Sequence, residues 1–157
     1  MTLAPRTPRA VRRTSAAVAA GALVAASLLV ASPASAVGCT TTGCDGTDPS
    51  NTGCSADARN ATNQPAYIVK GATTLAVVEL RYSPTCGTNW GRINNRVSPS
   101  SVKVTAYRDS PRKTTPWYGG TGTQYYGDQL YGDTSTICAV GEVVYNGVTY
   151  TSSPLCA

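Results

Sequence analysis

The sequence predicts an all-β domain, a small sandwich or barrel of about six to eight short strands, with a short helical or coiled N-terminal cap held by disulfides. Three features lead to this prediction. Apolar and polar residues alternate in several segments after residue 66, an Asn146-Gly147 pair separates two of them, and all six cysteines lie between residues 39 and 156. Alternation with a period of two is typical of half-buried strands, and an even cysteine set in an exported chain indicates a disulfide framework.

Residues 1–36 have the composition of a secretory signal peptide. A basic segment, MTLAPRTPRAVRRTS, precedes the apolar run AAVAAGALVAASLLVA and the small-x-small pattern Ala34-Ser35-Ala36. This order predicts cleavage after Ala36 and secretion of residues 37–157 as a single β domain without a membrane span, because the apolar run is at the lower limit for crossing a bilayer. A loose lipid-attachment pattern at Ala36–Cys39 leaves a lipoprotein anchored through Cys39 as the alternative.

The positive charge of the chain belongs largely to this leader. The formal net charge is +5, but four of the 13 basic residues lie in the leader: Arg6, Arg9, Arg12 and Arg13. The secreted part is nearly neutral, so we expect no nucleic-acid partner. Its densest basic segment, YRDSPRKTT at 107–115, is interpreted as a solvated hairpin tip.

The cap is predicted from residues 37–65, which contain almost no large apolar side chain. Asp48-Pro49 is a helix-entry signal, because aspartate accepts hydrogen bonds from free amides and proline loses none at the first helical position. The helix that this signal predicts has at most one or two turns, since Pro65 follows soon after.

The strands are predicted from residue 66 onward. In VVELRYS, residues 77–83, Val78, Leu80 and Tyr82 fall on one face, whereas Glu79 and Arg81 fall on the other. The segments WGRINN at 90–95 and SVKVTAYR at 101–108 show the same alternation of apolar and polar residues and are also predicted as strands. Trp90, which opens the first of these, is interpreted as a core residue.

A two-residue hairpin is predicted in EVVYNGVTYT, residues 142–151. Asn146 and Gly147 are the residues that most readily adopt the positive φ that both turn positions need. Extending this pairing leaves Cys138 and Cys156 one residue out of register, an offset that a β-bulge absorbs. We therefore expect a Cys138–Cys156 disulfide.

The segment CDGTDPSNTGCSADA, residues 44–58, looks most like a chemical site. Its carboxylates Asp45, Asp48 and Asp57 are hard oxygen ligands, but their spacing does not match the alternate positions of a calcium-binding EF-hand loop. Paired catalytic carboxylates need apolar surroundings that raise one pKa, and this segment has few. The interpretation is therefore structural.

No catalytic residue, metal site or cofactor is predicted. The chain has no histidine and no CxxC pair, which argues against nucleophilic catalysis and against zinc. Glu79 and Glu142 lie in predicted strands, where cross-strand ion pairs are the simpler role. The lysines show no serine-lysine spacing motif.

A segment rich in tyrosine and glycine is the candidate binding surface. Exposed aromatic side chains with polar tips can stack on sugar rings or anchor a partner. The alternative is a set of half-buried strand and loop residues whose hydroxyl groups reach solvent. The candidate ligand-binding residues are Trp117, Tyr118, Tyr125, Tyr126 and Tyr131.

Residues 44–93 resemble a known family. The segments DGTDPSNTGCSADA and VELRYSPTCGTNWGRI carry the pattern D-P, G-C-x-x-D-A and E-L-R-Y-S-x-x-C-x-x-x-W-x-R. This pattern is similar to the domain of unknown function 2690 family, whose members are secreted Gram-positive, chiefly actinobacterial, proteins. The matching residues besides the cysteines are Asp48, Asp57, Glu79, Arg81, Tyr82, Trp90 and Arg92.

The resemblance carries no established activity. Some relatives hold this module outside the membrane behind a cytoplasmic helix-turn-helix domain, which implies binding or sensing rather than catalysis. It also implies a cysteine pairing that the residues alone leave open among three possibilities. Because Cys54 and Cys86 both belong to the shared pattern, we expect them to pair, which leaves Cys39 with Cys44 as a local loop.

We therefore expect a secreted, disulfide-stabilised, non-enzymatic binding or structural module that acts at the cell envelope. Its partner would be an envelope polysaccharide or another secreted protein. The alternative is a secreted effector, such as a protease inhibitor or a small toxin, whose loops are made rigid by disulfides.

Overall fold

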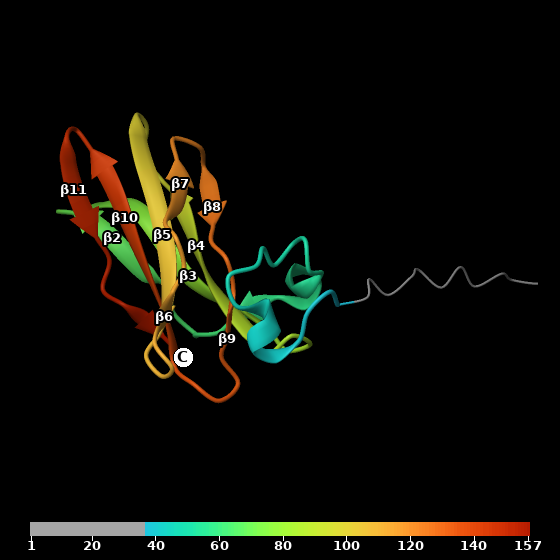
Figure 1. The fold of residues 1–157 in the computed structure, drawn as a ribbon. Coiled ribbons are helices and arrows are strands. Elements are labelled where there is room, and N and C mark those ends of the chain that lie inside the picture. The colour runs from blue at the N-terminus through green and yellow to red at the C-terminus, as the bar shows by residue number, and fades with distance from the viewer. Residues whose placement is uncertain (1–36) are drawn as a thin grey trace, which may run out of the picture. The chain divides into compact units, whose positions relative to one another are not determined.

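The computed structural model describes residues 37–157, and the predicted leader, residues 1–36, lies outside the described residues. Antiparallel strands form two sheets that pack face to face (Figure 1). The all-β prediction is confirmed, and the architecture is a sandwich. In the part of the chain that is described, no helix has the length and apolar character needed to cross a membrane.

The first sheet is built on two long central strands, β3 (Thr73–Ser83) and β4 (Thr88–Asn95). Two short strands share the outer edge of β3, and two more share the outer edge of β4. These edge strands are β1 (Arg59–Asn60) and β2 (Ala66–Lys70) on β3, and β8 (Gln124–Tyr126) and β9 (Leu130–Tyr131) on β4.

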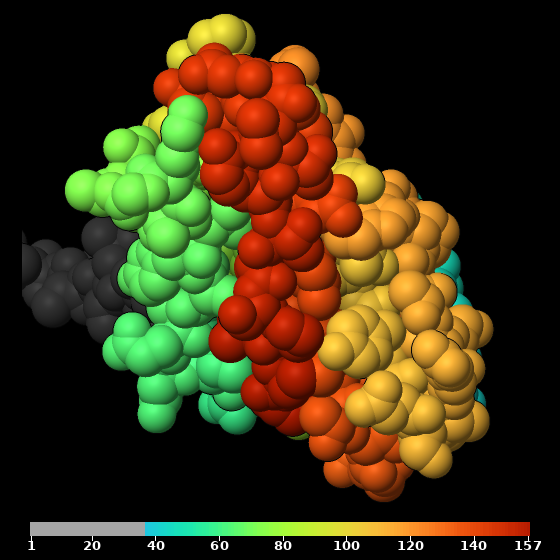
Figure 2. All heavy atoms as spheres, turned by 90° about the vertical axis from the view of Figure 1, so that its left-hand side faces the viewer, coloured from blue at the N-terminus to red at the C-terminus, as the bar shows by residue number. Residues whose placement is uncertain are grey.

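The second sheet repeats this plan around β5 (Ser100–Arg108) and β10 (Ile137–Tyr145). Its edge strands are β6 (Lys113–Thr114) and β7 (Tyr118–Gly120) on β5, and β11 (Val148–Thr151) and β12 (Leu155–Cys156) on β10. Figure 2 shows the segment that contains β2 beside the C-terminal hairpin, where the edges of the two sheets contact each other.

The described strands number twelve, more than the six to eight expected, because every edge is interrupted. Pro65, Pro116 and Pro154 lie in three of the four interruptions. Proline has no N–H to donate to a ladder, so it ends an edge strand without disturbing the central strands.

The core lies between the two sheets. It consists of the inward-facing residues of the long strands, such as Val78, Leu80, Ile93 and Val104, which are fully buried. Gly91 lets the sheets approach closely, because a Cβ at this position would lie 2.6 Å from Val104 Cγ2. Of the three residues predicted on one face in 77–83, Val78 and Leu80 are fully buried in the core, whereas Tyr82 is partly exposed.

The predicted hairpin is confirmed. Asn146 and Gly147 have φ values of 51° and 76°, and Tyr145 stands opposite Val148. Farther along, Cys138 stands opposite Cys156. The one-residue offset between the β10–β11 register and the β10–β12 register therefore falls in the segment after β11. There Ser152 bonds Gly141 twice, through its backbone N–H and through its side-chain oxygen, which accepts from Gly141 N at 3.0 Å.

The N-terminal cap contains two short 3₁₀ turns, η1 (Thr41–Cys44) and η2 (Cys54–Asp57), linked by coil. At the predicted helix entry, Asp48 Oδ1 accepts from the backbone N–H of Ser50 at 2.7 Å. The chain then makes a turn that leads into η2 rather than an α-helix, since Gly53 adopts a left-handed φ of 78°.

Candidate functional site

A groove of roughly 170 Å³ lies between the cap and the outer face of the first sheet. We call it the cap groove. Its cap side includes Ser50 and Ser55, and its sheet side is formed by Arg81, Trp90, Arg92, Gln124 and Tyr126.

Strand periodicity explains why these side chains gather on one face. Since Leu80 and Ile93 face the core, their neighbours Arg81 and Arg92 must face outward. The register places Arg81 opposite Trp90, and it places Arg92 between Glu79 on β3 and Tyr126 on β8. Three neighbouring strands therefore contribute to one polar surface.

Trp90 lies in this surface and not in the core between the sheets. Its side chain is only 4% exposed, so the expected burial of Trp90 is confirmed. It is one of the buried apolar residues, as expected, but it lies outside the main cluster between the sheets and lines the cap groove. The polar cap segment covers a face that would otherwise expose the indole ring to water.

Hydrogen bonds hold both arginines of the cap groove in place. Arg92 Nε donates to Glu79 Oε2 at 2.6 Å, and Asn94 Nδ2 donates to the same oxygen at 2.9 Å. Arg81 donates one terminal nitrogen to Asn60 Oδ1 and the other to the backbone oxygen of Ala58 at 2.7 Å. The expected cross-strand role of Glu79 is thus observed with Arg92 as the partner.

The charges of the cap groove do not balance, because two guanidinium groups face one carboxylate. The pKa of Arg81 is lowered by its partial burial and by the positive charge of Arg92, while Glu79 acts in the opposite direction. Burial alone would raise the pKa of Glu79, but hydrogen bonds from Arg92 and Asn94 and the charges of both arginines outweigh it and lower the pKa. Glu79 is therefore ionised at neutral pH, and the groove keeps an excess positive charge.

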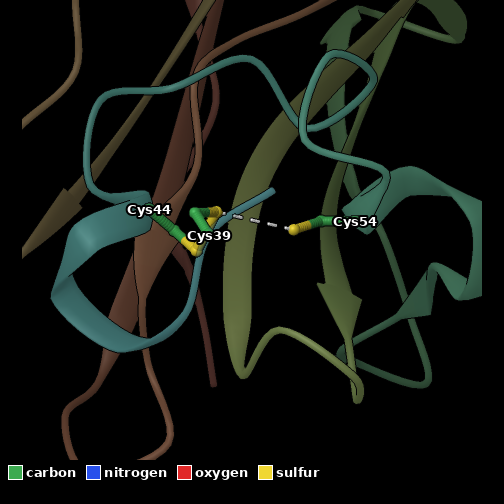
Figure 3. A group of neighbouring side chains, drawn as sticks. All are labelled: Cys39, Cys44 and Cys54. Carbon is green, nitrogen blue, oxygen red and sulfur yellow. Dashed lines mark hydrogen bonds between the residues drawn. A yellow bond between two sulfur atoms is a disulfide. The ribbon is translucent and has the colours of Figure 1, made fainter. Parts of the chain in front are cut away.

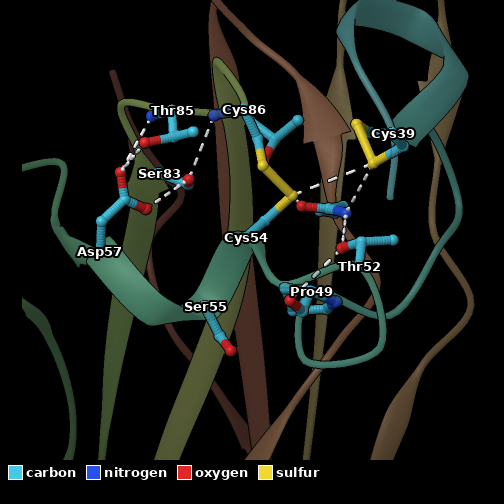
Figure 4. The surroundings of a disulfide bond; sticks show 12 residues. Cys39, Pro49, Thr52, Cys54, Ser55, Asp57, Ser83, Thr85 and Cys86 are labelled. Carbon is cyan, nitrogen blue, oxygen red and sulfur yellow. Dashed lines mark hydrogen bonds between the residues drawn. A yellow bond between two sulfur atoms is a disulfide. The ribbon is translucent and has the colours of Figure 1, made fainter. Parts of the chain in front are cut away.

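Asp57 clamps the cap to the turn between β3 and β4 and lies outside the cap groove (Figure 4). One oxygen accepts from Ser83 Oγ at 2.6 Å, and the other accepts from the backbone N–H and the hydroxyl of Thr85 at 2.9 and 2.6 Å. These bonds outweigh burial and lower the pKa of Asp57. Together with the Cys54–Cys86 disulfide beside it, this carboxylate fixes η2 on the hairpin.

The three disulfides join Cys39 to Cys44, Cys54 to Cys86 and Cys138 to Cys156. The sulfur atoms of Cys39, Cys44 and Cys54 lie within 4.8 Å of one another (Figure 3). Because each sulfur is already bonded in a disulfide, this cluster has no thiolate to offer a metal. It is a packed sulfur core for the cap.

A buried ion pair joins the cap to the second sheet, and sequence reasoning missed it. Arg108 is 3% exposed, and its two terminal nitrogens contact the two oxygens of Asp45 at 3.1 and 2.8 Å. The interpretation of residues 107–115 as a solvated tip is therefore wrong for Arg108. One signal could have found it, since Arg108 continues the inward-facing series of Val102, Val104 and Ala106.

The aromatic candidates do not form one surface. Trp117, 43% exposed, lies on the second sheet, where Lys103 Nζ is 4.6 Å from the ring centroid and pairs with Glu142. Tyr126, 39% exposed, lines the cap groove on the first sheet. The other three are less exposed: Tyr118, Tyr125 and Tyr131.

Two of these less exposed tyrosines have fixed partners. The Tyr118 hydroxyl donates to Asp128 Oδ2 at 2.6 Å, and this bond, with burial and the carboxylate charge, raises the pKa of Tyr118 to about 12. Tyr125 packs against the core, and its hydroxyl oxygen accepts from the backbone N–H of Gly122. Tyr82, from the family pattern, lies outside the cap groove and donates to Asp133.

Comparison with known protein families matches residues 42–140 to a family described as "Protein of unknown function (DUF2690)". No curated protein and no solved structure matches the chain. The family match begins within η1 and ends within β10, so it includes most of the cap, all residues that line the cap groove, and the strands β3, β4 and β5. The chain therefore belongs to the DUF2690 family of proteins of unknown function.

Proposed function

We propose that the protein is a secreted, non-enzymatic binding module that acts at the cell envelope, and that the cap groove is its ligand-binding site. The observation that carries this proposal is the convergence of Arg81, Arg92 and the exposed Tyr126 on one concave surface. A concave site with a few converging polar groups is the usual form of a ligand-binding site. The groove is also where Arg81, Trp90 and Arg92 of the family pattern meet.

The chemistry of the cap groove supports binding rather than catalysis. Glu79 is committed to Arg92, and its lowered pKa makes it a poor proton donor or acceptor at neutral pH. Ser50 and Ser55 have hydroxyl oxygens 3.4 Å apart, but the chain has no histidine to activate either of them.

The disulfides support the proposed secretion. All six cysteines are paired, which is typical of proteins that fold in an oxidising compartment. Two of the three disulfides lie in or anchor the cap, the part of the protein with few apolar contacts. Oxidation after export would therefore complete the wall of the cap groove.

The two exposed residues among the five aromatic candidates, Trp117 and Tyr126, provide the test of this site. Protein from the culture medium is incubated with insoluble peptidoglycan or chitin, and the fraction that sediments is measured. We expect Tyr126→Ala to weaken retention about fivefold or more, because removing an aromatic contact from a binding site costs about 1–3 kcal/mol. Trp117→Ala, a matched change on the other sheet, should leave retention unchanged.

Two results would contradict the proposal. If Trp117→Ala abolished retention while Tyr126→Ala had no effect, the ligand site would lie on the second sheet. If the protein bound no envelope polymer and instead inhibited a secreted protease slowly and tightly, the protein would be an effector.

A further inference from the structure

We infer that the ligand of the cap groove is an acidic glycopolymer, which places one singly charged oxyanion, a carboxylate or a phosphodiester, on Arg92 and Arg81. This inference rests on the proposed function and identifies the chemical class of its ligand. Three observations support it: the unbonded terminal nitrogens of Arg92, the net positive charge of the groove, and the uncharged polar side chains beside the arginines.

The free donors belong to Arg92. Its Nε is bonded to Glu79, but neither terminal nitrogen donates to any residue in the described range 37–157. A guanidinium with free terminal nitrogens presents parallel N–H groups that match the two oxygens of a carboxylate or a phosphodiester. The side chain is 27% exposed, so an incoming ligand can reach it.

The groove holds these donors in place before a ligand arrives. Glu79 fixes Arg92, whereas Asn60 and the backbone oxygen of Ala58 fix Arg81. The neighbouring Tyr126 hydroxyl lies 3.4 Å from Ser50 Oγ, which links β8 to the cap. Preorganised side chains lose little conformational entropy on binding, so less of the contact energy is spent on ordering them and the affinity is higher.

The charge count selects a single negative charge. Two guanidinium groups and one ionised carboxylate leave one excess positive charge, and a monoanion neutralises it. Burial is the main cause of the lowered pKa of Arg81, and the positive charge of Arg92 adds to it, while Glu79 acts in the opposite direction. A dianionic phosphomonoester would reverse the sign of the groove and bring a second charge close to Glu79.

The remaining groups of the groove suit a sugar. Ser50, Ser55, Tyr126 and Gln124 offer uncharged donors and acceptors beside the arginines. Tyr126 adds an exposed ring on which the apolar face of a sugar can stack. Polymers of uronic acid and of polyol phosphodiesters share the necessary chemistry, which is one negative charge per repeat next to hydroxyl groups.

The test measures affinity of the secreted protein for three soluble polymers: polygalacturonate, poly(glycerol phosphate) and neutral amylose. We expect binding to at least one acidic polymer and no binding to amylose. Binding to polygalacturonate would identify the oxyanion as a carboxylate, and binding to poly(glycerol phosphate) would identify it as a phosphodiester. Arg92→Gln should weaken that binding about tenfold or more, because a charged hydrogen-bond pair is lost. Arg112→Gln removes the same charge from an exposed turn outside the groove and should leave the affinity within about twofold.

A second measurement needs no variant and so does not depend on whether Arg92→Gln folds. Raising the salt concentration from about 0.05 M to about 0.5 M should weaken binding of the wild-type protein, because ions screen partly exposed charges. Equal affinity for amylose, or binding that neither salt nor Arg92→Gln changes, would overturn the inference and leave the binding function intact. Failure to bind any envelope polymer, acidic or neutral, would instead overturn the proposed function.

Discussion

Replacing Asp45 with alanine is expected to lower the free energy of unfolding by about 3–5 kcal/mol. The change leaves the Arg108 guanidinium, whose side chain is 4% exposed, without its negatively charged partner. It also removes the acceptor of the backbone N–H of Tyr131, which donates to Asp45 Oδ1 at 2.7 Å. A buried charge without a partner is costly because the protein interior cannot replace its hydration.

Glu142→Ala is the matched control for this experiment. It breaks the Lys103–Glu142 ion pair, in which the lysine side chain is 44% exposed, and should cost about 0–1 kcal/mol. Urea denaturation of the oxidised protein measures both changes on one scale. Equal effects of the two substitutions would show that the Asp45–Arg108 pair is not buried in solution.

The second large effect is expected from loss of the Cys54–Cys86 disulfide. Replacing both cysteines with alanine should cost about 3–4 kcal/mol, because this bond closes a long loop and restricts the unfolded chain. The sequence separation is 32 residues, against 5 for Cys39–Cys44. The same replacement at Cys39 and Cys44 should therefore cost less, about 2 kcal/mol.

The comparison between these two double variants is informative because both bonds belong to the cap. Denaturant midpoints and slopes, measured without reductant, give the two free energies. If loss of Cys39–Cys44 cost as much as loss of Cys54–Cys86, chain entropy would not explain the role of the longer bond. The cap would then depend mainly on the local sulfur packing.

Local features of the sequence predict much of the sandwich. Alternation identifies the central strands, and the Asn146-Gly147 turn sets the register of β10 and β11 because only certain residues adopt its backbone angles. The edge strands could not be counted in the same way. Six of the eight have only two or three residues, which is too short to show a period. Five of these six, β1, β7, β8, β9 and β12, pair with strands that no short turn joins to them.

The candidate site is less predictable, because it is assembled from separate parts of the chain. Trp117 and Tyr126 lie nine positions apart, but the chain passes from the second sheet to the first between them. Likewise, Arg108 finds its partner 63 residues away in the cap. Alternation tells which face of a strand a residue occupies, but it cannot tell that a polar cap will cover that face and bury Trp90.

The two tryptophans allow the most direct test of the cap groove as the binding site. The chain has Trp90 and Trp117 only, one lining the cap groove and the other on the second sheet. The indole N–H signals of the ¹⁵N-labelled secreted protein are followed by NMR during titration with fragments of the bound acidic polymer. We expect a progressive, saturable shift of the Trp90 signal while the Trp117 signal stays unchanged. A shift of Trp117 with Trp90 unaffected would contradict the placement of the binding site in the cap groove.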